Sequence, residues 1–314
     1  MLSVTIFAFP LHSYAISDNA GTTNGAFLEL PTDARGVALG PAIVSMADGA
    51  EALRWNPGAL GHADQKEFDA THVQYFQGVQ VENMAAAYPM EDSALAASVM
   101  YLTAGALDGR DTQGQQTGNF NFYDMVGSVG YGRRLTSRAE SGADIFVGGD
   151  VKIVQEMIAS SEFQNAAVDL GVQVIPTRDL QIGAAVRNLS SSSANFPREL
   201  TGGASYTVLR SYTGAIGLRY TNDAPIRLSV ATEYRMEEFK SALRLGYMTH
   251  DPLDDSTDSN ISFLRSASLA GLTAGAGGEF KLPAFPRMTL GIDYAIAPFG
   301  ALGISHYVTV KIKW

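Results

Sequence analysis

Hydrophobic and polar residues alternate along most of the chain, from about Phe68 to Trp314, with turn residues between the runs. Because successive side chains of a strand point to opposite faces, this alternation predicts β-strands with one apolar and one polar face. Fourteen strands are expected. They are Phe68–Gln77, Val79–Pro89, Ser93–Thr103, Asn119–Arg134, Ala143–Ile158, Phe163–Ile175, Leu180–Leu189, Glu199–Leu209, Tyr212–Thr221, Ile226–Met236, Phe239–Thr249, Ser266–Phe280, Arg287–Ile296 and Leu302–Trp314. The pattern predicts an all-β domain over residues 65–314.

The polar faces of these strands carry charges of both signs among Gly and Ala. The charges are Asp150, Lys152, Asp169, Arg187, Arg219, Arg227, Glu233, Arg244 and Asp293. Such faces suit the polar interior of a membrane barrel, which must close because lipid satisfies no backbone groups. A soluble sandwich or barrel with its polar face in water is the alternative. In a barrel the charges either form ion pairs or line a route, and we favour pairing because lumenal charge is normally paired.

The expected connections differ in length between the two ends of the strands. The long ones follow strands three, seven and eleven, at Ala104–Gly118, Ser190–Arg198 and His250–Arg265, whereas those after even-numbered strands are tight. Short periplasmic turns and longer outer loops are typical of outer-membrane barrels. The asymmetry therefore favours an antiparallel barrel of fourteen strands with both termini on the periplasmic side.

A small-residue segment without alternation, Pro31–Leu60, precedes the strands. Asp33 can cap a helical turn that Gly40-Pro41 ends, and Asp48 can cap a helix over Gly49–Trp55 that Pro57 ends. A compact segment ahead of a barrel predicts a helical hatch in its lumen, within a leader and hatch region of residues 16–64. The expected hatch residues are Arg35, Gly36, Gly40, Asp48, Trp55, Asn56, Pro57 and Gly58.

Residues 1–15 are similar to the apolar core of a secretory signal peptide, with Ser13 and Ala15 at the small-residue positions of a cleavage site. No Lys or Arg occurs before Arg35, so the basic region of a signal is missing. A translation start further upstream would supply that region. An N-terminal strand is the alternative interpretation.

The composition narrows the class of protein. Charged residues make up 17% of the 314 residues, below the roughly 25% of soluble domains, and the net charge is −10. An acidic chain without a basic face is not expected to bind nucleic acid. Cysteine is absent, which excludes disulfides and thiolate metal sites.

No motif predicts a catalytic site, a metal site or a cofactor. The five histidines lack metal-ligand spacing, and Gly275–Phe280 has Phe280 where a dinucleotide loop needs its third glycine. The acidic run Asp251–Asp258 could offer oxygen ligands to Ca²⁺ but lacks the glycine and closing Glu of an EF-hand, so a solvated loop is preferred. We therefore expect a protein that is not an enzyme.

The segment from Asp33 to Gly58 resembles the N-terminal signature of the PorV/PorQ family, within the FadL-like outer-membrane barrels. The signature residues are Asp33-Ala34-Arg35-Gly36, Leu39-Gly40, Ala47-Asp48 and Trp55-Asn56-Pro57-Gly58. The resemblance continues at Val151-Lys152-Ile153 with Glu156, Asp169-Leu170-Gly171, Arg187-Asn188-Leu189, Arg244-Leu245-Gly246-Tyr247, Asp293-Tyr294-Ala295 and Gly300-Ala301-Leu302-Gly303. It covers essentially the whole mature chain. One departure is that Gly58 stands before Ala59, where the family has Asn-Pro-Ala.

The resemblance implies a fourteen-stranded barrel with an N-terminal hatch in the lipid of the bacterial outer membrane. It also implies a C-terminal signal, with Tyr307 and Trp314, that the outer-membrane insertion machinery reads. Its functional implication is type IX secretion or surface display, in which the barrel binds a secretion-channel subunit or a secreted cargo domain. The alternative is a FadL-like channel for hydrophobic small molecules such as long-chain fatty acids, and a third option is a purely structural barrel. We expect the hatch to be a stopper rather than a gate.

Overall fold

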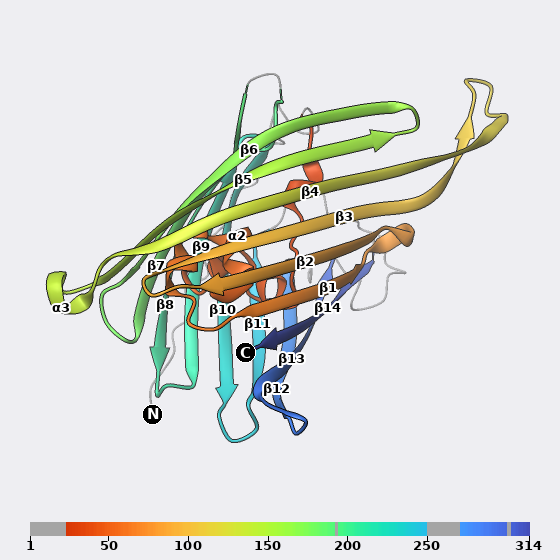
Figure 1. The fold of residues 1–314 in the computed structure, drawn as a ribbon. Coiled ribbons are helices and arrows are strands. Elements are labelled where there is room, and N and C mark those ends of the chain that lie inside the picture. The colour runs from red at the N-terminus through yellow and green to blue at the C-terminus, as the bar shows by residue number, and fades with distance from the viewer. Residues whose placement is uncertain (1–22, 192–193, 250–270, 300–302) are drawn as a thin grey trace.

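The computed structural model describes residues 23–191, 194–249, 271–299 and 303–314, and these form a closed antiparallel barrel of fourteen strands (Figure 1). The strands are β1 Glu67–Gln74, β2 Gln80–Pro89, β3 Ser93–Arg110, β4 Gln116–Thr136, β5 Asp144–Ile158, β6 Ser161–Ile175, β7 Leu180–Ser190, β8 Glu199–Val208, β9 Tyr212–Thr221, β10 Ala224–Met236, β11 Ser241–Met248, β12 Leu272–Leu282, β13 Phe285–Pro298 and β14 Ile304–Lys313. The predicted number, order and type of strands are confirmed.

Pairing of the first and last strands closes the barrel. β1 pairs with β14 from Glu67 opposite Lys313 to Gln74 opposite His306, which leaves neither strand with a free edge there. The outward side chains are largely apolar: Val129 is 63% exposed, Val151 57% and Ile216 61%. A belt of exposed aliphatic side chains on a closed barrel suits contact with lipid. No helix in the described part of the chain is long and apolar enough to cross a membrane.

The prediction of a long loop over Ala104–Gly118 is wrong. β3 continues to Arg110 and β4 begins at Gln116, so the two strands form a two-stranded extension beyond the rest of the barrel (Figure 1). β2 contributes no partner beyond Thr103, because its last pair joins Gln80 to Thr103. The glycines of this stretch resemble turn residues in sequence, which concealed the strands.

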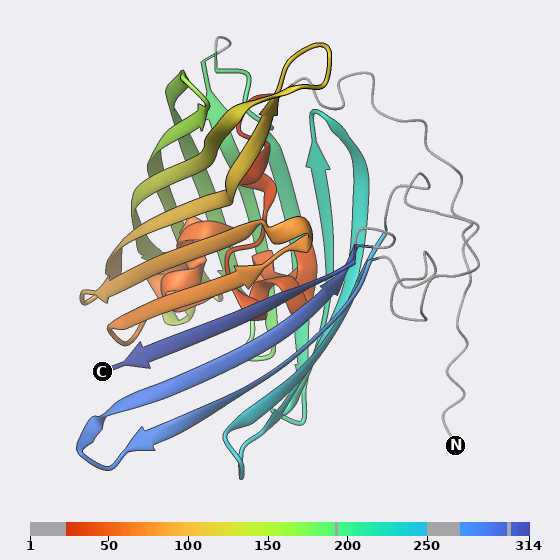
Figure 2. The ribbon, with the colours of Figure 1, turned by 90° about the vertical axis from the view of Figure 1, so that its right-hand side faces the viewer.

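The hatch lies inside the barrel, where strands surround its short helices (Figure 2). Its elements are η1 Ala26–Glu29, α1 Ala34–Leu39, η2 Gly40–Ser45, η3 Gly49–Glu51, α2 Ala52–Trp55 and η4 Pro57–His62. Two more short helices, η5 Phe76–Gly78 and α3 Arg138–Ser141, lie between strands. The positions of the predicted helices are correct, since α1 and the η3–α2 pair lie where the caps placed them.

One detail of the predicted hatch is confirmed and one is wrong. Gly40 ends α1 as its C-cap, at φ 57°, and a separate 3-10 helix, η2, begins there with Pro41 in its first turn, where a proline needs no hydrogen-bond donor. Asp48 precedes η3 but makes no side-chain cap, whereas Asp33 caps α1 by accepting from the Gly36 nitrogen at 2.5 Å. The predicted signal peptide 1–15, the loop His250–Arg265 and the acidic run Asp251–Asp258 lie outside the described residues.

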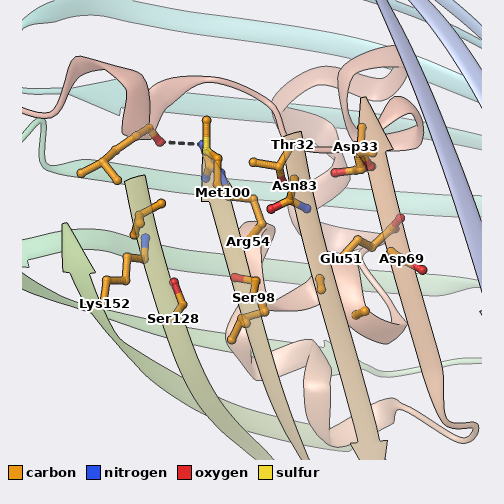
Figure 3. A pocket seen from close by; sticks show the side chains of 16 residues that line it. Thr32, Asp33, Glu51, Arg54, Asp69, Asn83, Ser98, Met100, Ser128 and Lys152 are labelled. Atoms are coloured by element: carbon orange, nitrogen blue, oxygen red, sulfur yellow. Dashed lines mark hydrogen bonds between the residues drawn. The ribbon is translucent and has the colours of Figure 1, made fainter. Parts of the chain in front are cut away.

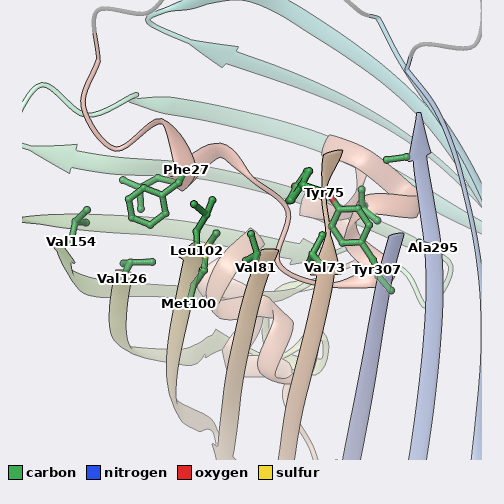
Figure 4. Close-up of a cluster of buried hydrophobic side chains, with 14 of the residues drawn as sticks. Phe27, Val73, Tyr75, Val81, Met100, Leu102, Val126, Val154, Ala295 and Tyr307 are labelled. Carbon is green, nitrogen blue, oxygen red and sulfur yellow. The ribbon is translucent and has the colours of Figure 1, made fainter. Parts of the chain in front are cut away.

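Hydrophobic side chains fill the space between hatch and wall. One cluster joins Phe27 of the hatch to wall residues such as Leu102, Val126, Val154 and Tyr307 (Figure 4). A second cluster contains the hatch side chains Leu39, Ile43, Leu53 and Leu60 together with small wall residues, Ala85 and Ala87 of β2, Ala94 and Ala96 of β3 and Ala215 of β9. The alanines give the hatch room to approach the wall closely, so the hatch packs directly on these strands.

Candidate functional site

The hatch contacts the wall through Asn56, which is completely buried. Its side-chain nitrogen donates to the carbonyl oxygen of Val44 in the hatch at 2.9 Å and to that of Val172 in β6 at 3.0 Å. Its side-chain oxygen accepts from the Gly58 nitrogen at 3.1 Å. One amide thus shapes the turn before η4, ties two hatch segments together and fixes them to the barrel.

Glycines of the wall make this approach possible. A Cβ on Gly171 would lie 2.2 Å from the Asn56 side-chain oxygen, and one on Gly148 would lie 2.2 Å from the Pro57 carbonyl oxygen. Real Cβ atoms do not approach other atoms so closely, so only glycine permits the observed packing. The Asn-Pro sequence of the hatch and these two wall glycines therefore form one contact.

Trp55 and Gly36 hold the interior of the hatch together. The Trp55 indole nitrogen donates to an Asp33 carboxylate oxygen at 2.6 Å, next to the α1 N-terminus. A Cβ on Gly36 would lie 2.4 Å from that same indole nitrogen, so the ring packs directly on the α1 backbone. Both contacts hold α1 against α2.

Ion pairs fasten α1 to one side of the wall. Arg35 contacts Glu51 within the hatch and donates to Glu233 of β10 at 3.1 Å. Glu233 also accepts from Arg244 at 2.6 Å, and Arg244 donates to Asp293 at 2.5 Å. Because these groups are buried, removal of one partner would leave an uncompensated charge in the lumen.

A second group of ion pairs lies on β5 to β9. Lys152 pairs with Asp169 at 2.5 Å, and Arg187 pairs with Glu199. Arg219 bridges Glu199 at 3.2 Å and Glu29 of the hatch at 2.5 Å. The structure thus divides the predicted lumenal charges between two networks.

The other predicted residues lie at the edges of these networks or outside them. Asp150 is buried without a hydrogen-bond partner, and Arg227 lines a lumenal cavity. Asp48, whose side chain is half exposed, lies 3.7 Å from Arg35. Tyr307 points inward and shares a 2.6 Å hydrogen bond with Tyr75, whereas Trp314 is exposed on the outside.

Sequence reasoning missed three charges that complete the networks, Glu51, Glu199 and Lys311. Lys311 donates to Glu51 at 2.7 Å, and Glu199 holds Arg187 and Arg219. The alternation could have identified two of them, because Lys311 and Glu199 lie at inward positions of their strands. Glu51 could be recognised as a partner only from the position of the hatch inside the barrel.

Two cavities lie on different sides of α1. The first has a volume of about 300 Å³ and a mostly apolar lining that includes Leu30, Pro31, Val37, Gly40, Pro41, Trp55, Met248, Ala297, Pro298 and Phe299. The second, of about 390 Å³, is charged and is lined by groups such as Arg35, Asp48, Arg235, Arg244, Asp293, Lys311 and Lys313. Since α1 contributes Val37 to one and Arg35 to the other, it forms part of the partition between them.

Comparison with known proteins identifies the fold. No protein-family model matches the sequence, and no curated protein matches it significantly. The structure is similar to the Pseudomonas putida toluene transporter TodX, with TM-score 0.54, 11% identity and coverage of 88% of this chain and 96% of that one. It is also similar to a Pseudomonas aeruginosa FadL homologue, with TM-score 0.55, 9% identity and coverage of 90% of this chain and 98% of that one. A third similar structure is the Ralstonia pickettii toluene transporter TbuX, with TM-score 0.52, 12% identity and coverage of 91% of this chain and 98% of that one.

At these identities the likeness shows the fold alone. The chain has the fold of FadL-like outer-membrane barrels, which is the coarser part of the resemblance found in the sequence. The closed barrel and its apolar exterior place the protein in the bacterial outer membrane. None of the comparisons points to the PorV/PorQ family in particular.

Proposed function

We propose that the barrel passes small hydrophobic molecules across the outer membrane and that the hatch closes the route. The observation that carries this proposal is the apolar cavity of about 300 Å³ between hatch and wall. Concave, mostly apolar cavities with a few polar groups are the usual sites of small-molecule binding. The likeness to two toluene transporters and a FadL homologue supports the same class of cargo.

The chemistry of the cavity favours an uncharged molecule. Arg219 and Glu199 line it, but they pair with each other at 3.2 Å, and Arg219 also holds Glu29. Apolar side chains make up most of the remaining wall, including Trp55 and Phe299. A charged ligand would have to break these buried pairs, which is costly.

Passage requires movement of α1. This helix lines the apolar cavity through Val37 and the charged cavity through Arg35. Thr273 of β12 donates to the Ala38 carbonyl at 3.0 Å, and the Ala34 nitrogen donates to Thr309 of β14 at 2.9 Å. These few contacts, together with the Arg35 ion pairs, would have to open for the two cavities to join. The hatch in this proposal is a gate, in contrast to the stopper expected from sequence.

The secretion or surface-display role implied by the PorV/PorQ resemblance has no support from the comparisons. An apolar cavity against the hatch is the feature by which an uptake channel differs from a partner-binding barrel, and this chain has it. We therefore prefer the channel over the secretion component.

The test uses Trp55 as a reporter of the cavity that it lines. Trp55 and Trp314 are the only tryptophans, so Trp314→Phe leaves Trp55 as the single indole while keeping an aromatic C-terminus. Titration of this protein in lipid nanodiscs with toluene is expected to change Trp55 fluorescence saturably. Cells that express the barrel are expected to take up radiolabelled toluene faster than cells without it.

Matched variants decide whether the cavity is responsible. Ala297→Phe places a ring in the cavity from β13 and replaces no residue of the hatch, so both binding and uptake should fall several-fold. Ala276→Phe adds the same ring to the exposed, outward side of β12 and should change neither. Absence of a saturable response in the parent protein, or equal loss in both variants, would refute the proposal.

A further inference from the structure

A small cavity lined by both polar and apolar side chains lies between the hatch and strands β1 to β5, apart from the larger apolar one (Figure 3). The hatch contributes Asp33, Glu51 and Arg54, and the wall contributes Asp69 and Asn83 among others. The cavity has a volume of about 30 Å³, which suits an occupant the size of a water molecule or a small ion.

The register of the sheet explains why space remains here. Across the strands Asp69 pairs with Ala85, Ala85 with Ser98, Ser98 with Ser128 and Ser128 with Lys152. This row therefore has a charged residue at each end and three short side chains between them. The short side chains cannot reach the hatch, so a polar gap is left beneath it.

Most charged groups around the gap have partners elsewhere. Lys152 is held by Asp169 at 2.5 Å, and Glu51 is held by Arg35 and by Lys311 at 2.7 Å. Asp33 accepts from the Gly36 and Trp55 nitrogens. These groups need no additional ligand.

Asp69 is the exception among the acidic residues that line the gap. It is 2% exposed, and neither of its carboxylate oxygens has a hydrogen-bond partner. Its cross-strand neighbour Lys311 directs its amine to Glu51 instead. A buried carboxylate without a partner is strongly disfavoured, so the cavity calls for a positive or hydrogen-donating occupant.

We propose that this cavity binds a small monovalent cation of the Na⁺ type, with the Asp69 carboxylate as its charged ligand. Hard cations take oxygen ligands, and Asn83, Thr71 and Ser98 offer neutral oxygens on the same wall. The described residues include no group of three or more acidic or histidine side chains that could hold a metal ion, which argues against a divalent site. The cation joins the hatch to β1 through the Asp69 carboxylate, which neither Arg54 of the hatch nor Lys311 of β14 contacts by a hydrogen bond.

The test measures binding rather than transport, so its outcome is independent of the proposed channel function. The Trp314→Phe protein in nanodiscs is unfolded with urea while Trp55 fluorescence reports release of the hatch. The midpoint is expected to be higher in NaCl than in KCl or choline chloride of equal ionic strength. Equal chloride concentrations remove general screening as an explanation.

Variants assign the effect to Asp69. Asp69→Asn keeps the shape but removes the charge, and should abolish the difference between NaCl and choline chloride. Asp150→Asn is the matched control, because Asp150 is equally buried and unpartnered but does not line this cavity. It should retain the difference. Ser98→Val removes one neutral oxygen from the cavity and should reduce the difference between NaCl and choline chloride. This variant decides the test if Asp69→Asn does not assemble.

Three outcomes would overturn the proposal. Equal midpoints in NaCl and choline chloride would mean that no Na⁺ binds. A larger effect of millimolar Ca²⁺ or Mg²⁺ would contradict a monovalent site. A midpoint that is equal in NaCl and choline chloride, with a pH dependence that Asp69→Asn removes, would show that Asp69 is neutralised by a proton instead.

Discussion

The side-chain amide of Asn56 donates to the carbonyl oxygen of Val172 across the boundary between hatch and barrel, over 3.0 Å. The bond joins residues that are 116 positions apart in sequence, and it lies beside glycines that let the two backbones meet. The Asn-Pro sequence of the hatch is therefore a docking element. Its role can be tested without knowledge of the cargo.

Asn56→Asp should release the hatch from the wall. The substitution keeps the size of the side chain but replaces the donor of two hydrogen bonds with an acceptor that faces two carbonyl oxygens. A buried group left unsatisfied costs about 1–3 kcal/mol, and more when it is charged. Urea titration of Trp55 fluorescence in the Trp314→Phe background measures the loss. Asn119→Asp, at an exposed position of β4, should leave the midpoint unchanged.

Gly171→Val should also displace the hatch, through steric overlap rather than lost hydrogen bonds. Its Cβ would occupy space within 2.2 Å of the Asn56 oxygen and 2.8 Å of the Gly58 nitrogen. We expect a barrel that still assembles but conducts ions more readily in planar bilayers. Gly202→Val is the control, since a Cβ there meets no atom within 4 Å. Equal conductance of the two variants would contradict a packed hatch contact at Gly171.

The fold was predictable from sequence because barrel strands follow a simple rule. Side chains alternate between lipid and lumen, so apolar belts such as Val151 and Ile153 on β5 mark each strand without tertiary information. The rule failed at Ala104–Gly118, where both faces of the extension are exposed and no alternation is required. The alternation of apolar and polar residues is missing there because solvent surrounds both faces, although the backbone forms strands.

The site was less predictable. The alternation identified Glu233 and Arg244 as inward charges, but their pairing depends on strand register and on the position of Arg35 in the hatch. Register also creates the gap beneath Asp69, since it aligns three short side chains. Sequence carries no direct signal for either arrangement, because both arise from segments far apart in the chain.

Deletion of residues 32–61 should leave a barrel that assembles and leaks. Several lumenal pairs lie wholly within the wall, including Lys152 with Asp169 and Arg244 with Asp293, so these charges stay neutralised without the hatch. Heat-dependent migration in gels should report a folded barrel, and bilayer conductance should rise above that of the full chain. Unchanged conductance would contradict the assignment of this segment as the closing element.

Removal of Trp314 should impair membrane insertion more than any single change in an outer connection. Trp314 is exposed at the end of β14, where an insertion factor can reach it, whereas Tyr307 is buried in the lumen against Tyr75. We therefore expect Tyr307→Phe to insert normally. The measurement is the fraction of protein in the outer-membrane pellet, and normal insertion without Trp314 would exclude a terminal signal at this residue.

Hatch docking should weaken as pH rises from about 4 to about 6, because of Asp33. This carboxyl belongs to the hatch and not to a membrane-spanning strand, and its burial, followed by the negative charge of Glu51, raises its pKa from 3.8 to about 6. Between these values the docked hatch binds a proton that a released, solvated Asp33 has already lost. Each unit of pH in this window therefore favours release by up to about tenfold, and the effect levels off above pH 6.

Asp33→Asn removes the titration and should make the docking midpoint independent of pH over the same window. The variant should be less stable overall, since one of its two side-chain acceptors becomes a donor facing either Gly36 or Trp55. Trp55 fluorescence during urea titration at several pH values measures both effects. A pH dependence that persists in Asp33→Asn would assign it to another group, whereas a midpoint that rises with pH in the parent protein would contradict the direction deduced from burial.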